Sequence, residues 1–180
     1  MNDRIYNQNP NKLRNKERIK RLEVDKVISI CLKQGKIKTL LDVGTGSGLF
    51  AEAFYRNGIK VSGIDINKKM IKTAKLHLPK CKFFIASAES LPFRKNSFDA
   101  VFFGLVLHEV EDYHKTISEA FRVSKQYTFI LEWKFKEEEF GPPIKHRLKS
   151  KFIEKLSNEA GYRDIIKKRL KNLILYILKK

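Results

Sequence analysis

Short apolar runs alternate with helix-like segments over most of this 180-residue chain, and this alternation restricts its fold more than any other feature. The runs are KTLLDV, KVSGID, KFFIAS, FDAVFFGL and YTFILEW, and helical spacing of apolar residues predicts helices between and after them, including 113–124 and 144–160. The runs are apolar without clean alternation, which is typical of strands buried on both faces. We therefore expect an α/β fold whose mostly parallel sheet is covered by helices on both faces.

Two further segments flank this series. From Asn11 to Gln34, apolar residues recur at mostly helical spacing, which predicts an N-terminal helix with Gly35 as its C-terminal cap. At the other end, RDIIKKRLKNLILYILKK holds two strand-like runs separated by a Lys-Asn turn, which predicts an antiparallel hairpin. We expect one folded unit, made of a basic N-terminal segment, 1–35, and a main domain, 36–180.

The first apolar run leads directly into the glycine-rich loop GTGSG. Gly44, Gly46 and Gly48 let the backbone turn tightly and leave room for a ligand at the N-terminus of the following helix. Their spacing is G-x-G-x-G, whereas dinucleotide-binding enzymes use G-x-G-x-x-G. Asp42 precedes the loop, at a position where dinucleotide folds usually carry no charge. The loop therefore predicts a cofactor site of another kind.

The next two runs end in polar residues that can complete this site. Asp65 follows the loop by 21 residues from Gly44, and an ionised carboxylate can accept hydrogen bonds from both hydroxyls of a ribose. The alternative role for Asp65 is a helix N-cap, which Asn67 can fill instead. After the third run, Ser87, Ala88 and Glu89 can read the edge of an adenine ring. The alternative is a loop that only packs Leu91 and Phe93 into the core.

Five blocks in order, LLDVGTGSG, GIDIN, ASAESLPF, NSFDAVFFGLVLHEVED and YTFILEWK, carry a family resemblance. The chain resembles the class I S-adenosylmethionine-dependent methyltransferases, and it is similar in particular to small members related to the ubiquinone/menaquinone-biosynthesis methyltransferases. The match spans residues 36–145. It implies a Rossmann-like, seven-stranded sheet in which the C-terminal hairpin supplies the last two strands, one of them antiparallel.

The resemblance also implies the cofactor, S-adenosylmethionine, with S-adenosylhomocysteine as product. In relatives, the positions of Asp42 and Gly44 to Gly48 approach the methionine part, Asp65 holds the ribose, and Ala88 with Glu89 borders the adenine. Relatives often carry Asp where Ser87 stands, which implies a weaker or different adenine contact here. The predicted cofactor residues are Asp42, Gly44, Thr45, Gly46, Gly48, Asp65, Ile66, Ser87, Ala88, Glu89 and Leu105.

Candidates for the acceptor side follow the fourth and fifth runs. Ligands of parallel α/β sheets bind beyond the carboxyl ends of the strands, which places Leu105 to His108 and Glu132 there. Methyl transfer depends mainly on holding donor and nucleophile close, and a base is needed only when the acceptor must lose a proton. We predict His108 as that base, oriented by Glu109 or Glu132. The alternative is that His108 only packs or caps.

Two segments near this side have less defined roles. Gly141-Pro142-Pro143 predicts a rigid turn before a helix that opens with Lys145, His146 and Arg147. This basic cluster can bind an acidic acceptor, or it can neutralise Glu137 to Glu139. By the same resemblance, the N-terminal segment with Tyr6 forms a lid over the cofactor.

The formal net charge of +18 is concentrated at the two ends of the chain. Residues 1–39 hold 11 Lys/Arg against 4 Asp/Glu, and residues 145–180 hold 12 against 3. A basic surface can attract nucleic acid, acidic lipid headgroups or an anionic substrate. A Lys-rich solvated surface explains the same charge without any partner. Charge alone therefore does not decide the acceptor.

Together these features favour an S-adenosylmethionine-dependent methyltransferase that acts on a small molecule, with an anionic acceptor allowed by the charge. RNA or another nucleic acid is the alternative acceptor. Against it, no N/D-P-P-Y/F follows the fourth strand, and no cysteine lies where a cytosine C5 enzyme places its nucleophile. A non-catalytic protein that binds S-adenosylmethionine is a third interpretation.

We expect a cytoplasmic protein without a bound metal. The first residues lack the apolar segment of a secretory signal. The longest apolar stretches fall well short of the roughly 20 residues that cross a bilayer. Cys31 and Cys81 provide neither a disulfide framework nor a metal-ligand set, and we expect both to stay reduced.

Overall fold

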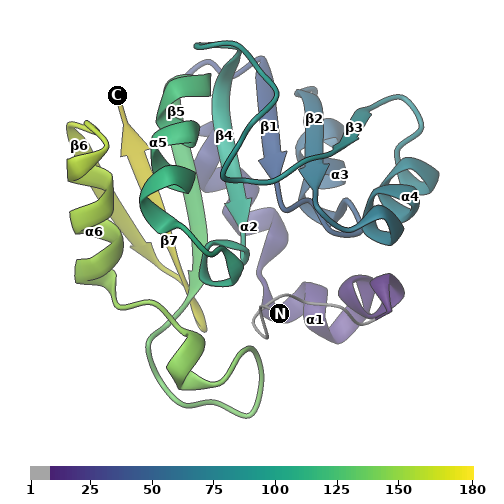
Figure 1. Cartoon of the computed structure of the whole chain (residues 1–180). Helices are drawn as coiled ribbons and strands as arrows, with labels where there is room; N and C mark the ends of the chain where they lie inside the picture. Colours follow the sequence, from purple (N-terminus) through teal and green to yellow (C-terminus); the bar gives the residue numbers. More distant parts are fainter. Residues whose placement is uncertain (1–8) are drawn as a thin grey trace.

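The computed structural model describes residues 9–180, so the lid role predicted for Tyr6 lies outside the described residues. A seven-stranded sheet forms its centre (Figure 1). The strands are β1 (Thr39–Val43), β2 (Lys60–Asp65), β3 (Lys82–Ile85), β4 (Phe98–Gly104), β5 (Ser124–Trp133), β6 (Asp164–Arg169) and β7 (Leu173–Lys179). Their order is β3-β2-β1-β4-β5-β7-β6, and this arrangement confirms the Rossmann-like α/β fold expected from the sequence.

Strands β1 to β5 run parallel, and the strand order reverses between β1 and β4. Such a reversal opens a crevice beyond the carboxyl ends of the strands. The chain turns back after β6, and Leu170 N donates to Leu173 O at 2.9 Å in that turn. As a result β7 is antiparallel to both β5 and β6, as the predicted hairpin requires.

Helices cover both faces of the sheet, as the apolar strands require. They are α1 (Lys16–Arg21), α2 (Val24–Leu32), α3 (Leu49–Arg56), α4 (Lys68–His77), α5 (Tyr113–Val123) and α6 (Ser150–Glu159), with short 3-10 helices η1 (Pro10–Arg14), η2 (Leu107–Glu109) and η3 (Ile144–His146). Phe102 of β4 packs with α2, α3 and α4 in one core, and Phe103 packs with α5 and α6 in the other. Successive strand side chains point to opposite faces, so β4 contributes to both cores.

The single N-terminal helix predicted for residues 11–34 is wrong, because the segment forms η1, α1 and α2. Asn15 caps α1 by accepting a hydrogen bond from Glu17 N, and Glu23 adopts a left-handed conformation, φ 49°, between α1 and α2. Glu23 Oε2 accepts a hydrogen bond from Lys171 N at 2.7 Å, so a distant turn contributes to the break. The predicted cap at Gly35 is also wrong, since Lys33 closes α2.

The helix predicted from 144 also begins elsewhere. Ile144 to His146 form only η3, Arg147 is extended, and α6 starts at Ser150. The side chain of Arg147 explains the interruption, because it is buried against the preceding loop. Within residues 9–180, no helix combines the length and the apolar character needed to span a membrane.

Candidate active site

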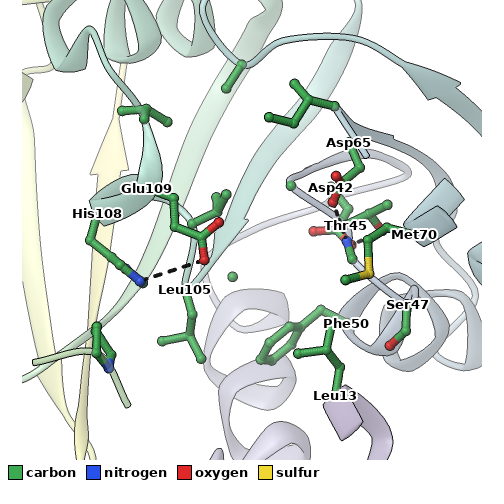
Figure 2. A pocket seen from close by; sticks show the side chains of 18 of the residues that line it. Leu13, Asp42, Thr45, Ser47, Phe50, Asp65, Met70, Leu105, His108 and Glu109 are labelled. Carbon is green, nitrogen blue, oxygen red and sulfur yellow. Dashed lines mark hydrogen bonds and ion pairs between the residues drawn. The ribbon is translucent and has the colours of Figure 1, made fainter. Parts of the chain in front are cut away.

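A cavity of 1090 Å³ lies at the crevice between β1 and β4. Figure 2 shows Asp42, Thr45 and Asp65 on one side of it, with His108 and Glu109 on the other. The structure brings most of the predicted cofactor residues to its wall: Asp42, Gly44, Thr45, Gly46, Asp65, Ile66, Ser87, Ala88, Glu89 and Leu105. Gly48 instead lies at the start of α3, where an added Cβ would be 3.2 Å from Ala74 Cβ of α4.

The glycine loop after β1 needs glycine for both conformation and space. Gly44 and Gly46 have φ angles of 64° and 54°, which residues with a Cβ rarely adopt. A Cβ on Gly44 would approach Val106 Cγ2 to 2.2 Å. Thr45 N donates to Ile64 O at 2.8 Å, which fixes the loop to β2. The loop is therefore held close against the cavity.

Asp42 ends up buried beneath this loop, with 1% of its surface exposed. Thr45 Oγ1 donates a hydrogen bond to Asp42 Oδ2 at 2.6 Å. Burial raises the pKa of Asp42 to about 7, although the Thr45 hydrogen bond opposes the rise and the nearby Asp65 adds to it. A carboxyl of this kind gains from a cationic partner, because a positive charge stabilises its ionised form.

Asp42 should make the stability of the unliganded protein depend on pH. Its pKa is raised in the folded state, so ionisation favours unfolding, and stability falls as the pH rises from about 4 to about 7. Asp42→Asn removes this cost and is expected to stabilise the protein by about 2–4 kcal/mol at pH 8, with little effect at pH 4. Urea unfolding at pH 8 and pH 4 measures the free energy of unfolding of the variant and of wild type. An equal gain in stability at the two pH values would contradict the prediction.

Asp65 lies at the carboxyl end of β2 and accepts hydrogen bonds from two backbone amides. Its Oδ2 accepts from Gly46 N at 2.9 Å, and its Oδ1 accepts from Asn67 N at 2.8 Å. Burial raises the pKa of Asp65, while both amides oppose the rise. Asn67 Oδ1 caps α4 by accepting from Lys69 N, so Asn67 takes the alternative N-cap role. Asp65 instead faces the cavity beside the glycine loop.

The loop after β3 lines the cavity and also packs into the core. Leu91 is buried, and the ring of Phe93 packs edge-on against Phe98. Ser87 Oγ accepts a hydrogen bond from Glu89 N at 3.1 Å. Glu89 Oε1 accepts from the backbone amides of residues 111 and 112, at 2.9 and 3.1 Å. This wall of the cavity is therefore fixed by hydrogen bonds and by core packing.

These features fit a ligand such as S-adenosylmethionine, with polar groups at one end and an adenosine at the other. Ser47 lines the cavity, and its buried Oγ has no hydrogen-bond partner among the described residues. Buried polar atoms are normally satisfied, so this hydroxyl suits a polar ligand group. Phe50 and Met70, which the sequence patterns did not single out, provide apolar wall (Figure 2). Nothing in their local spacing distinguishes them from core residues.

His108 and Glu132 form a buried pair on the other side. His108 Nδ1 lies 2.9 Å from Glu132 Oε2, and the His108 backbone amide donates to Glu132 Oε1 at 3.1 Å. His108 is 4% exposed and Glu132 is 1% exposed, so the pair is shielded from water. Burial lowers the pKa of His108, but the negative charges of Glu132 and Glu109 outweigh it, and the net pKa is raised.

The local backbone positions this pair. Leu105, between β4 and η2, has a left-handed φ of 63°, and its amide donates to Leu131 O at 2.9 Å. This strained turn starts the short helix η2, which carries His108 and Glu109. His108 Nδ1 bonds Glu132, and His108 Nε2 lies 3.9 Å from Glu109 Oε1. The structure thus brings the three predicted catalytic residues together, and their catalytic role stays a prediction.

The loop between β5 and α6 is gathered around one buried guanidinium. Arg147 donates hydrogen bonds to the backbone carbonyls of residues 134, 136, 140 and 142 and to Glu138 Oε2, at 2.5 to 3.1 Å. It also lies 5.6 Å from the Trp133 ring. Arg147 is therefore a structural residue, whereas Lys145 and His146 line the cavity. Of the two roles considered for the basic cluster, Arg147 neutralises Glu138.

We expect Arg147→Met to destabilise the protein by about 2–4 kcal/mol, because several carbonyls and Glu138 lose a charged partner. Amide hydrogen exchange should accelerate over 134–146 and stay slow in the sheet. Urea unfolding and hydrogen exchange measure the two effects. Arg169→Met, on the exposed strand β6, is the matched control. Equal losses in the two variants would show that the guanidinium does not organise the loop.

Comparison with known proteins identifies the fold and the family. Residues 41–131 match the model of a family described as a methyltransferase domain. A demethylmenaquinone methyltransferase of Renibacterium salmoninarum is 34% identical over 103 residues, covering 57% of this chain and 44% of the relative. The ubiquinone/menaquinone biosynthesis C-methyltransferase UbiE of Rickettsia felis is 40% identical over 98 residues, covering 48% of this chain and 40% of the relative. This chain thus spans less than half of either relative.

Solved structures share the architecture over nearly the whole chain. A SAM-dependent methyltransferase from Aquifex aeolicus superposes with a TM-score of 0.77 at 24% identity, covering 96% of this chain and 98% of that one. A SAM-dependent methyltransferase from Methanosarcina mazei superposes with a TM-score of 0.72 at 23% identity, covering 84% of this chain and 96% of that one. The family match takes in just over half of the residues and includes the glycine loop, Asp65 and most of β5. The chain therefore belongs to the methyltransferase domain family, as its resemblance to the S-adenosylmethionine-dependent methyltransferases of ubiquinone and menaquinone biosynthesis implies.

Proposed function

We propose that this protein transfers the methyl group of S-adenosylmethionine to a small-molecule acceptor. One observation carries the proposal: a single cavity has the glycine loop and two carboxylates on one side and His108, which is bonded to the buried Glu132, on the other. A non-catalytic protein that only binds S-adenosylmethionine does not need a second side with a histidine bonded to a carboxylate. Donor and acceptor can therefore meet in one water-poor space.

The donor side binds by shape and charge. Asp65 offers its carboxylate to the ribose hydroxyls, and the glycine loop lets the ligand approach the backbone. Asp42 and Ser47 provide polar groups for the amino-acid part. When bound, S-adenosylmethionine supplies a sulfonium-activated methyl group that a nucleophile displaces. The residues of this chain orient that group rather than react with it.

The acceptor side can remove a proton. Glu132 accepts from Nδ1 of His108, which leaves Nε2 as the atom that can take a proton. As the acceptor's nucleophilic atom forms its bond to the methyl carbon, its proton passes to Nε2, and the Glu132 carboxylate stabilises the resulting imidazolium. This arrangement favours an acceptor that loses a proton, such as a hydroxyl, a thiol or an acidic C–H group.

The proposal is tested with S-adenosylmethionine labelled in its methyl group and two extracts, one of metabolites and one of total RNA. We expect label in the metabolite fraction and none in RNA. Label in RNA alone would replace the small molecule by a nucleic acid as acceptor. If S-adenosylhomocysteine binds in calorimetry while neither extract is labelled, the protein is a non-catalytic cofactor-binding protein, and the proposal fails.

A further inference from the structure

Helix α4 and strand β3 carry many lysines and no acidic residue. Residues 66–88 contain six Lys and no Arg, Asp or Glu. All six lysines are exposed, and they are Lys68, Lys69, Lys72, Lys75, Lys80 and Lys82. Within residues 9–180, none of them has a side-chain hydrogen bond or ion pair. Figure 1 shows this α4–β3 surface at one end of the sheet, with β6 and α6 at the opposite end.

Elsewhere in the chain, lysines on helices are paired with acids. Lys26 of α2 lies 2.9 Å from Glu23, and Lys155 of α6 lies 3.7 Å from Glu159. Such mixed charges are what a helix face exposed only to water usually contains. The α4–β3 surface lacks them, so solvation alone does not explain its charge.

The lysines also oppose the folding of α4. Lys68 and Lys69 begin the helix, and its first turn has no acid, although a helix N-terminus favours negative charge. Lys68 and Lys72 are four residues apart, and Lys72 and Lys75 are three apart. Like charges at these spacings destabilise a helix. The stability of the fold therefore gives no reason for this charge, whereas a partner with many negative charges does.

An apolar side chain lies at the centre of the lysine face. Leu76 is 74% exposed, the highest value among the large hydrophobic residues within 9–180. Helical geometry places it opposite the three buried residues of α4 and between Lys69 and Lys72. Ile66, just before α4, and Ile85 of β3 are each more than half exposed. Lysines around exposed apolar side chains are typical of a helix that lies on a membrane surface.

We propose that the α4–β3 surface binds an anionic lipid membrane, with Leu76 among the headgroups. Lysine ammonium groups are attracted to anionic headgroups, and their alkyl stems lie along apolar surface. RNA has the same charge, but proteins bind its unpaired bases with stacked aromatic or Arg side chains. This face has Leu76 at its centre and no Arg. Ile66 and Met70 also line the cavity, so binding places the site beside the membrane.

Co-sedimentation of the full chain with lipid vesicles tests the partner. One set of vesicles contains phosphatidylcholine alone, and the other contains about one third phosphatidylserine as well. We expect binding to the anionic vesicles to be at least about tenfold stronger, and to weaken as salt is added. Equal binding to the two sets, or no binding to either, would overturn the inference.

Charge reversal tests the location. Lys69→Glu/Lys72→Glu is expected to weaken binding to the anionic vesicles at least about tenfold. An acid near the N-terminus of α4 favours the helix, so thermal unfolding should show no loss of stability, and the weaker binding cannot come from unfolding. Lys151→Glu/Lys168→Glu changes the net charge equally on α6 and β6, and is the matched control. Equal losses of binding in the two double variants would overturn the inference.

Leu76→Ser distinguishes a membrane from a nucleic acid. We expect it to weaken vesicle binding about fivefold, because an inserted apolar side chain is lost. Ile166→Ser, which replaces an exposed apolar residue of β6, should bind vesicles as wild type does. Vesicle binding that Leu76→Ser leaves unchanged, with an RNA oligonucleotide bound more tightly than vesicles, would assign the surface to nucleic acid and overturn the inference. The labelling of extracts tests the proposed function separately.

Discussion

Asp65→Ala is expected to weaken the binding of S-adenosylhomocysteine at least a hundredfold. The substitution removes a carboxylate that can accept both ribose hydroxyls, and charge-assisted hydrogen bonds contribute about 1.5–3 kcal/mol each. It also leaves Gly46 N without its acceptor, so the loop that faces the ligand loses one of its two hydrogen bonds to β2. Isothermal titration calorimetry of the purified variant measures the change in affinity.

Asp99 provides a matched control for this prediction. Its Oδ2 also accepts two backbone amides, from Lys38 N and Thr39 N at 2.9 Å, but it lies at the start of β4, away from the cavity. Asp99→Ala should therefore reduce stability and leave affinity for S-adenosylhomocysteine within about twofold. If Asp65→Ala binds as tightly as wild type, or Asp99→Ala loses as much affinity, the ribose assignment is wrong.

Glu132→Gln is expected to lower kcat by about a hundredfold to a thousandfold, with little change in affinity for S-adenosylhomocysteine. The amide cannot stabilise a protonated His108, and it no longer selects the tautomer with the proton on Nδ1. The pH profile supplies a second readout. Activity should rise with pH as His108 loses its proton, and removing the Glu132 charge should move this rise to lower pH.

Glu109→Gln is the companion variant. Glu109 also raises the pKa of His108, but its Oε1 lies 3.9 Å from Nε2 and makes no close hydrogen bond there. We expect a loss of kcat below about tenfold and a smaller shift of the pH profile than for Glu132→Gln. Arg147 lowers the pKa of His108 and is unchanged in both variants. A reduced rate with an unmoved pH profile for Glu132→Gln would indicate a purely structural role.

The sequence predicted the sheet well because its signals are local. Apolar runs in β1, β2 and β4 need only their own residues to indicate buried strands, and the Lys-Asn turn marks the hairpin of β6 and β7. The N-terminal helix and the start of α6 were wrong for the opposite reason. Their breaks involve contacts between distant residues, Glu23 with Lys171 N and Arg147 with the 134–142 carbonyls. Helical periodicity contains no information about such partners.

The residues of the candidate site also fall into two groups, those indicated by local sequence and those that depend on tertiary contacts. Asp42, Asp65 and His108 gather because parallel strands place their carboxyl ends along one edge, so a strand prediction brings the residues together. The opposite wall could not be derived, since it depends on how α1 packs against Phe140. Arg21 and Trp133 both contact the Phe140 ring, and only this tertiary packing brings them to the same part of the fold. Their positions in the chain carry no motif.

Because β7 lies between β5 and β6, the strands beside the donor side and beside the His108 side of the cavity are completed at different stages of synthesis. The glycine loop and Asp65 belong to strands made early, whereas Glu132 lies opposite Ile174 in the pairing of β5 with β7. The strand that carries Glu132 therefore gains its second neighbour only after residue 174 has emerged and β7 has entered the sheet. A growing chain makes its donor half first, and the strand that carries Glu132 is paired on both sides only when the last gap in the sheet is filled.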